Sequence, residues 1–198
     1  THPIVAPIND LNDTYVNFDG ITYAKGASVL KQLVFYVGRE KFFQGIHNYL
    51  QKHAYSNATL ADLLGELERT SGRDLKAWSA QWLEQSGINT IAANVEETAD
   101  GTISRLTLKQ SAPIEHPVLR SHRLAVGFYD EDKTTGAIVR TNRLELDVEG
   151  ESTEVAAAVG LKRPAFILVN DEDLTYTKIR FDAKSLAFAE RNLHRFDD

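Results

Sequence analysis

The chain has 198 residues, a formal net charge of -6 and 42% hydrophobic residues, the composition of an ordinary globular protein with one or two domains. The acidic balance argues against a nucleic-acid surface, which needs clustered Lys and Arg, and no apolar run approaches the roughly 18 residues of a membrane span. With no cysteine and no leader-like start, a cytoplasmic protein is expected.

The first 88 residues are expected to be mainly helical, after an irregular stretch over residues 1–17. Apolar residues recur at helical spacing in four segments, which predicts four helices. Gly38 is expected to end the first helix, Thr59 to cap the start of the third, and Gly87 to cap the end of the fourth. The expected apolar positions of these helices are Leu30, Leu33, Val34, Val37; Phe42, Phe43, Ile46, Tyr49, Leu50; Leu60, Leu63, Leu64, Leu67; and Leu75, Trp78, Trp82.

Trp78 and Trp82 stand four residues apart in the last of these helices, so they share one face. Such a pair is either a stacking platform for sugars or bases, or part of the core. Core packing is the favoured interpretation, because both tryptophans lie on the apolar stripe that must be buried against the other helices.

At about residue 88 the period changes from 3.6 to 2. Roughly seven short strands with turns between them predict a β-sandwich over residues 89–182. Residues 183–198 return to helical spacing and are expected to begin a further domain. The predicted class is therefore α+β, with domains at 1–88, 89–182 and 183–198. The sequence begins with Thr1 instead of Met and contains no Met at all. It is therefore expected to be a piece of a longer polypeptide.

Most catalytic motifs are absent: the sequence has no GxSxG, P-loop, GxGxxG or HExxH pattern. His47 and His53, like His116 and His122, are six residues apart, too badly placed in a helix or strand to share a metal. All four are expected to be solvated or hydrogen-bonded surface histidines. The acidic run "NDEDLT" at residues 170–175 is expected to be a solvated loop and not a calcium site.

The stretch "FDGITYAKGASVL" contains Tyr23 where an extended approach is expected to turn into a helix. A phenol stays protonated at neutral pH and can donate a hydrogen bond to an oxyanion in a dry site. Gly20 and Gly26 flank it and allow close approach. By periodicity alone, packing at a helix start is the favoured role for Tyr23.

The same stretch, followed by "VGREKFFQGIHNYLQKHAYSNATLADLLGELERTSGRDLKAWSAQWLEQSGIN", resembles the end of the catalytic domain of the aminopeptidase N family of zinc-dependent gluzincins. The later segments "HRLAVGFYD" and "LVNDEDLTYTKIRFD" resemble, more loosely, the small β-sandwich domain of its bacterial cytoplasmic members. The resemblance implies that residues 1–88 end a thermolysin-like catalytic domain. It implies peptide substrates, and contacts with the remaining domains of the same protein.

In that family the tyrosine of the Y-x-K-G-A segment donates a hydrogen bond to the tetrahedral intermediate, which implies this role for Tyr23. The aromatic residue five positions earlier, Phe18, corresponds to a position that can line the substrate pocket, although a core phenylalanine would explain it as well. The family's HExxH zinc ligands, third ligand Glu, general base and GxMEN segment are not in this sequence.

The intact parent is therefore expected to bind zinc. This chain is expected to hold no metal ligand, to bind no zinc and to be inactive alone. The alternative is a non-catalytic helical and β-sandwich scaffold that binds a protein or sugar, with Trp78 and Trp82 exposed.

Overall fold

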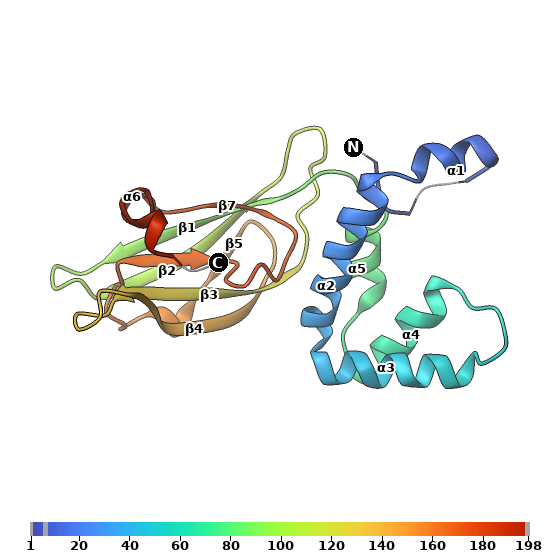
Figure 1. Cartoon of the computed structure of the whole chain (residues 1–198), viewed down its shortest axis with the longest axis horizontal. Helices are drawn as coiled ribbons and strands as arrows, with labels where there is room; N and C mark the ends of the chain where they lie inside the picture. The colour runs from blue at the N-terminus through green and yellow to red at the C-terminus, as the bar shows by residue number, and fades with distance from the viewer. Residues whose placement is uncertain (1, 6–7, 197–198) are drawn as a thin grey trace. The chain divides into compact units, whose positions relative to one another are not determined.

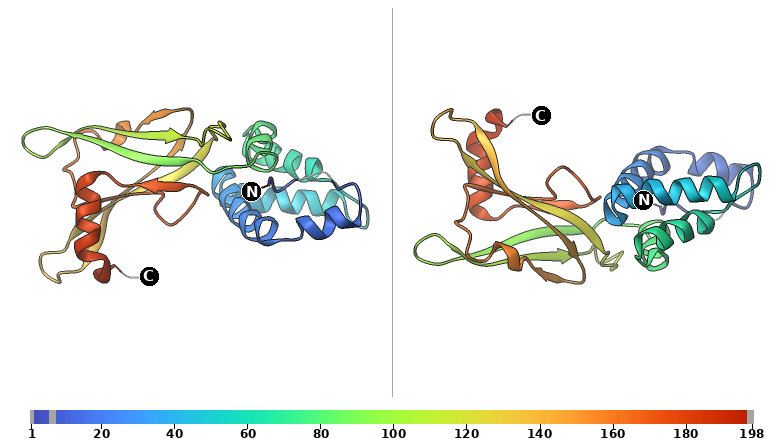
Figure 2. Two further views of the ribbon diagram at one scale, coloured as in Figure 1. Left: turned by 90° about the horizontal axis from the view of Figure 1, so that it is seen from above. Right: turned by 90° about the horizontal axis from the view of Figure 1, so that it is seen from below.

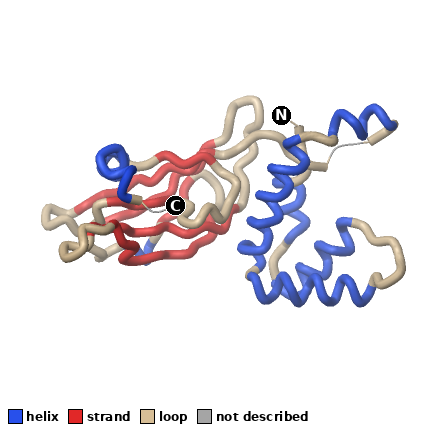
Figure 3. Tube along the Cα trace, in the orientation of Figure 1, coloured by secondary structure: helices blue, strands red, loops and turns tan. Residues whose placement is uncertain are grey.

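The computed structural model describes residues 2–5 and 8–196, and the chain forms two compact units, Thr1–Gly87 and Ile88–Asp198. Among the described residues, the strands all lie in the second unit, whereas most of the helices lie in the first (Figure 3). The class is α+β, as predicted. No helix in the described part of the chain is long and apolar enough to cross a membrane.

The first unit is a set of helices joined by short turns (Figure 1). Its elements are α1 (Leu11–Asn17), a π-helical turn η1 (Ile21–Lys25), α2 (Gly26–Val37), α3 (Arg39–Lys52), α4 (Leu60–Ser71) and α5 (Leu75–Trp82).

Two predicted helix ends in this unit are confirmed. Gly38 follows α2 with φ of +89°, a conformation that suits glycine and stops the helix. Thr59 caps α4: its hydroxyl accepts the N–H of Asp62, and the Asp62 carboxylate accepts the N–H of Thr59. This reciprocal pair is a capping box, in which two otherwise unpaired N–H groups are satisfied.

Two other expectations for this unit are wrong. The stretch over residues 1–17 contains a helix, because Asp10 caps α1 by accepting the N–H of Asp13. The helix α5 ends at Trp82, with Leu83 as its C-cap, so Gly87 does not cap it. Gly87 instead has φ of +93° in the chain that follows.

The core of the first unit contains both tryptophans. Trp78 and Trp82 are 2% and 1% exposed, and the ring of Trp78 lies 6.2 Å from that of Tyr36 between centroids. Core packing is therefore confirmed, and the stacking platform is wrong. The helices α3 and α4 approach closely at Gly45, where an added Cβ would lie 2.7 Å from Leu67 Cδ2.

The second unit has two sheets, with strand orders β5-β2-β1-β7 and β4-β3-β6. Adjacent strands are antiparallel except for the parallel pair β1 and β7. Its elements are β1 (Thr90–Glu97), β2 (Ile103–Ser111), β3 (His122–Glu131), β4 (Ile138–Val148), β5 (Ser152–Glu154), η2 (Ala156–Ala158), β6 (Phe166–Val169), β7 (Lys178–Arg180), α6 (Ala183–Asn192) and η3 (Leu193–Arg195).

The two sheets share one hydrophobic core, which makes the unit a β-sandwich. Ile91 and Leu106 from the first sheet are fully buried in the same cluster as Leu124, Val126 and Ile167 from the second. In β1, β3 and β4, alternate residues point into this core, because successive side chains of a strand face opposite sides of the sheet. Figure 2 shows the two layers of strands in this unit.

The segment expected to begin a further domain lies within the second unit. The helix α6 packs against β6 (Figure 2), where the hydroxyl of Ser185 accepts the N–H of Ile167 at 3.0 Å. Asp182 caps this helix and pairs with Arg163 at 2.6 Å. These contacts tie α6 to the sandwich, and the assignment of residues 183–198 to another domain stays a prediction.

Candidate functional site around Tyr23

Tyr23 lies in a π-helical turn and not after an extended approach. The chain runs from α1 through a bend into η1, where the N–H of Gly26 donates to the C=O of Ile21. This bond spans five residues, one more than in an α-helix, so the turn holds one extra residue. Such π-turns are rare and recur at functional sites.

The side chains of this turn differ in exposure. Lys25 is only 8% exposed, and its ammonium donates to the C=O of Gln85 at 3.4 Å. Tyr23 is 59% exposed, and within the described residues its hydroxyl makes no hydrogen bond. The packing role favoured by periodicity is therefore not what this unit shows: the phenol projects outward with a free donor.

Phe18 lies beside Tyr23 on the same exposed surface. The two rings meet edge to face, with centroids 5.1 Å apart and planes at 84°. Phe18 is 68% exposed, so it does not belong to the core of this unit. The structure thus brings together the two residues that the sequence singled out, which lie five positions apart in the chain.

Asp19 and His2 complete the surroundings of the turn, and neither was expected to contribute. The Asp19 carboxylate accepts the N–H groups of Ile21 at 2.9 Å and Thr22 at 3.0 Å, and its second oxygen lies 3.0 Å from His2 Nε2. The N–H of Thr22, then His2, hold the pKa of Asp19 below its usual value. The bond to the Pro3 carbonyl, then Asp19, raises the pKa of His2. An aspartate just before a helix is a capping signal that the sequence offered.

Chemically, this arrangement can donate one hydrogen bond from a neutral phenol to an acceptor that approaches the exposed face. A tyrosine hydroxyl donates to a carbonyl oxygen or to an oxyanion, and gains most where negative charge develops. Within the described part of the chain, no three His, Cys, Asp or Glu side chains are placed to hold a metal ion. None of the described residues is therefore assigned to a zinc site.

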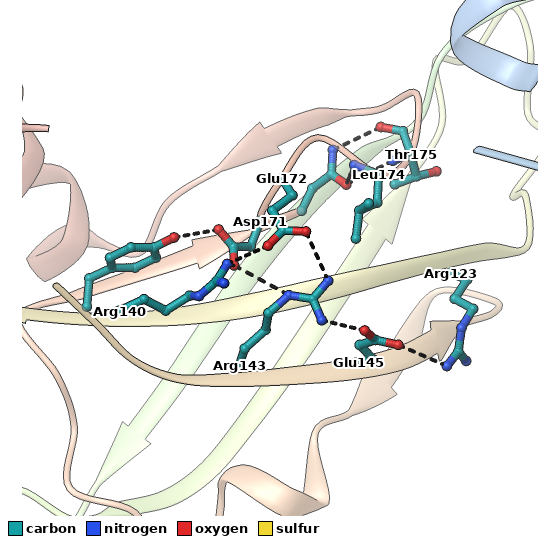
Figure 4. Close-up of polar contacts among 10 residues, drawn as sticks. Arg123, Arg140, Arg143, Glu145, Asp171, Glu172, Leu174 and Thr175 are labelled. Atoms are coloured by element: carbon teal, nitrogen blue, oxygen red, sulfur yellow. Dashed lines mark hydrogen bonds and ion pairs between the residues drawn. The ribbon is translucent and has the colours of Figure 1, made fainter. Parts of the chain in front are cut away.

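The acidic run at residues 170–175 is not the solvated loop that was expected. Asp171 is 2% exposed, accepts a hydrogen bond from the Tyr129 hydroxyl at 2.6 Å, and pairs with Arg140 at 2.8 Å (Figure 4). Asn170 organises the loop by accepting the N–H groups of Leu174 and Thr175, each at 3.0 Å. Asn170, Asp171 and Thr175 are buried, whereas Glu172 and Asp173 are exposed, so the run is a partly buried polar loop.

His122 also departs from its expected surface position. It is fully buried, with Nδ1 2.8 Å from the Thr175 hydroxyl and Nε2 2.8 Å from Gln110 Oε1. Because the Gln110 amide nitrogen donates to Gly150, its oxygen faces His122, so His122 Nε2 carries the proton. Burial, and then the charge of Arg120, lowers the pKa of His122 to about 3, which keeps it neutral.

Comparison with known proteins identifies the first unit. Residues 1–82, which include Phe18 and Tyr23, match the family model described as "Peptidase family M1 domain". Aminopeptidase N of Streptomyces lividans is 54% identical over 204 residues, and the match covers 100% of this chain. The chain belongs to peptidase family M1. The predicted resemblance to the aminopeptidase N family is confirmed.

Other aminopeptidases are similar to this chain over nearly its whole length. Probable aminopeptidase 1 of Saccharolobus solfataricus is 29% identical over 96% of this chain, and glutamyl aminopeptidase of Bos taurus is 26% identical over 98%. The chain spans only 24%, 22% and 20% of the Streptomyces, Saccharolobus and bovine proteins. The matched relatives are therefore at least four times longer than this chain.

A solved structure has a similar fold. The crystal structure of Legionella pneumophila aminopeptidase A in complex with aspartic acid matches 87% of this chain and 19% of its own, with a TM-score of 0.67. Its sequence identity is 17%, so this likeness concerns the fold alone.

Proposed function

We propose that this chain is part of a zinc-dependent aminopeptidase that removes N-terminal residues from peptides, and that Tyr23 is a catalytic residue of it. One observation carries the assignment of Tyr23: its hydroxyl is exposed and makes no hydrogen bond within the described residues, in a segment that matches the M1 family. A tyrosine that served only to pack would bury its ring. The kinship with Aminopeptidase N of Streptomyces lividans supports the reaction class.

In the proposed reaction, Tyr23 donates its phenolic hydrogen bond to the oxygen of the peptide carbonyl that is attacked. This oxygen gains negative charge as the tetrahedral intermediate forms, so the bond is stronger in the transition state than in the ground state. Zinc, held by residues of the longer protein outside this chain, would polarise the carbonyl and activate water. On this proposal, the chain alone is inactive.

Phe18 is proposed to line the pocket for the substrate side chain. Its exposed ring contacts Tyr23 edge to face, so a substrate bound against one ring would touch the other. An aromatic face there offers apolar area without a charge to desolvate.

The proposed partners are peptide substrates and the remaining domains of the same protein, with residues 89–182 as its sandwich and 183–198 as the start of another domain. A nucleic-acid partner is not proposed, because the chain carries a net charge of -6.

A cytoplasmic location is proposed on the absence of cysteine, since disulfides are rare in the cytoplasm. Activity that stays with the cytosolic fraction of lysed cells tests this location.

The experiment is to make Tyr23→Phe in the longer protein that contains this chain, and to measure hydrolysis of an aminoacyl arylamide. Loss of one oxyanion donor is expected to lower kcat by about 10²–10³-fold. The melting temperature is expected to stay unchanged, because the lost hydroxyl has no partner within the described residues. A chelator is expected to abolish the activity of the unmodified protein, and added zinc to restore it.

Tyr55→Phe is the matched control, because Tyr55 is fully exposed on the loop after α3 and loses the same hydroxyl. It is expected to leave kcat unchanged. A Tyr23→Phe protein with unchanged kcat and lower stability would show that packing was its role. Hydrolysis by the 198-residue chain at the level of the longer protein would refute the assignment of roles.

A further inference from the structure

One side chain caps the start of the turn that carries Tyr23. The Asp19 carboxylate accepts the N–H groups of Ile21 and Thr22, and the Asp19 carbonyl accepts the N–H of Tyr23 at 3.2 Å. Three consecutive backbone donors at the start of the turn therefore end on one residue. The N–H groups of a first helical turn otherwise have no partner within the helix, so the Asp19 carboxylate supplies the acceptor for two of them. The third bond goes to the Asp19 backbone carbonyl, which any residue at this position would offer.

Asp19 is itself held in place from a distant part of the sequence. The second carboxylate oxygen lies 3.0 Å from His2 Nε2, and the other ring nitrogen of His2 lies 2.7 Å from the Pro3 carbonyl oxygen. The Asp19 carboxylate and the Pro3 carbonyl each accept from one ring nitrogen, so a doubly protonated His2 donates to both. A charge-assisted bond of this kind fixes the carboxylate more firmly than a neutral one.

Two other contacts hold the turn: the Thr22 hydroxyl donates to the Asn17 carbonyl at 2.6 Å, and the Lys25 ammonium donates to the Gln85 carbonyl at 3.4 Å. The Tyr23 ring touches Phe18, which is itself exposed, and a Cβ placed at Gly20 would meet no atom within 4 Å. A π-turn is rare compared with the α-helix that it precedes here. The direction of the phenol therefore depends on hydrogen bonds that hold the backbone, and the Asp19 carboxylate makes the two that lie directly before Tyr23.

We propose that Asp19 is a positioning residue for the peptidase reaction: it holds the π-turn so that the Tyr23 hydroxyl stays at the reacting carbonyl, and His2 holds Asp19. This proposal rests on the proposed function of Tyr23. In this role Asp19 contacts neither the substrate nor a metal, and it affects the reaction only by holding the turn. A displacement of the phenol by about 1 Å is enough to lower a rate by about 10²-fold.

The first measurement needs no activity. In the longer protein, hydrogen exchange followed by mass spectrometry reports on the peptide that covers residues 20–25. Asp19→Ala is expected to speed exchange there by at least about tenfold, because bonds to a charged acceptor are lost. Asp19→Asn, which keeps an oxygen acceptor, is expected to restore most of the protection. Asp10→Ala is the matched control, since Asp10 caps α1 in the same way, and it is expected to leave this peptide unchanged.

The second measurement is kinetic. Asp19→Ala is expected to lower kcat at least about tenfold with KM changed by less than about twofold, because only the transition-state contact is disturbed. The double variant Asp19→Ala/Tyr23→Phe is expected to be no slower than Tyr23→Phe, since Asp19 acts through Tyr23. His2→Ala is expected to lower kcat less than Asp19→Ala does. Independent, multiplying losses in the double variant would overturn the proposal.

The two measurements separate this proposal from the proposed function. If Tyr23→Phe keeps full activity, the function of Tyr23 is refuted and this proposal falls with it, whatever the exchange rates show. If Tyr23→Phe is inactive but Asp19→Ala changes neither exchange nor kcat, only the positioning role is refuted. Faster exchange with unchanged kcat refutes it too, because the turn would then not need to be held.

Discussion

The rings of Phe18 and Tyr23 meet edge to face, with centroids 5.1 Å apart, although both side chains are mostly exposed. The two exposed rings together form an apolar surface that carries one hydrogen-bond donor, the Tyr23 hydroxyl. Such a surface is typical of a substrate-binding wall, where apolar side chains supply contact area and a few polar groups fix orientation.

Phe18→Ala in the longer protein is expected to raise KM for peptides with a large apolar first residue by about tenfold, with kcat nearly unchanged. The change removes contact that is present equally in the ground state and the transition state. Stability should change by less than about 0.5 kcal/mol, because the side chain is exposed. Steady-state kinetics and a thermal melt measure both. Phe43→Ala, which removes another exposed phenylalanine from α3, is the control and should leave KM unaltered.

Gly45→Ala is expected to destabilise the first unit by about 1–3 kcal/mol, because its added methyl would overlap Leu67 of α4. Gly65→Ala is the matched control: it lies in a helix too, and a Cβ there meets no atom within 4 Å. This second change is expected to stabilise by about 0.5–1 kcal/mol, since alanine is the better helix former. Urea unfolding followed by tryptophan fluorescence measures both, because Trp78 and Trp82 lie in this unit. Equal effects of the two changes would contradict the close approach of α3 and α4.

Asp171→Asn is expected to destabilise the second unit by about 2–4 kcal/mol, because it removes a buried negative charge that pairs with Arg140 and accepts the Tyr129 hydroxyl. Glu172→Gln, one residue along, is the control. Glu172 contacts the same Arg140 at 2.7 Å but is about half exposed, so its loss should cost less than about 1 kcal/mol. Urea unfolding followed by the circular dichroism signal of the β-sheets measures the change in stability for both variants. A cost for Glu172→Gln as large as for Asp171→Asn would show that burial is not what makes the pair matter.

His122 makes the stability of the second unit depend on pH. It is neutral in the folded state, with a pKa of about 3, whereas the unfolded chain binds a proton at an ordinary histidine pKa of about 6.5. The unfolded state therefore holds more protons as pH falls, so this contribution to stability is complete above pH 6.5 and is lost toward pH 3. The expected slope is about 1.4 kcal/mol per pH unit at pH 4–5.

Urea unfolding of the second unit at several pH values measures this slope. His122→Gln is expected to flatten it while lowering stability at every pH, because the bonds to Thr175 and Gln110 are altered. His116→Gln, which changes the histidine six residues before His122, is the control and should keep the slope of the unmodified protein. An unchanged slope in His122→Gln would mean that another group binds the proton.

Only part of the candidate site could be predicted from the sequence. Tyr23 and Phe18 were found through a family motif and not through periodicity, which favoured packing. Asp19 carried a capping signal, but its link to His2 joins residues 17 apart in the chain, and no local pattern predicts that contact. A π-turn has no sequence signature of its own, so the outward direction of Tyr23 could not be predicted either.

Features with a local cause follow from the sequence alone. Glycine after α2, the Thr59 capping box, the apolar stripes of the helices and the alternation in the strands all depend on residues within a few positions of each other. Whether the polar residues are buried or exposed follows only from the tertiary structure. Asp171 is buried because Arg140, 31 positions away, neutralises it, and His122 is buried because Thr175, 53 positions away, bonds its ring. A buried polar group needs a partner to offset its lost hydration, and only the folded chain brings such distant partners together.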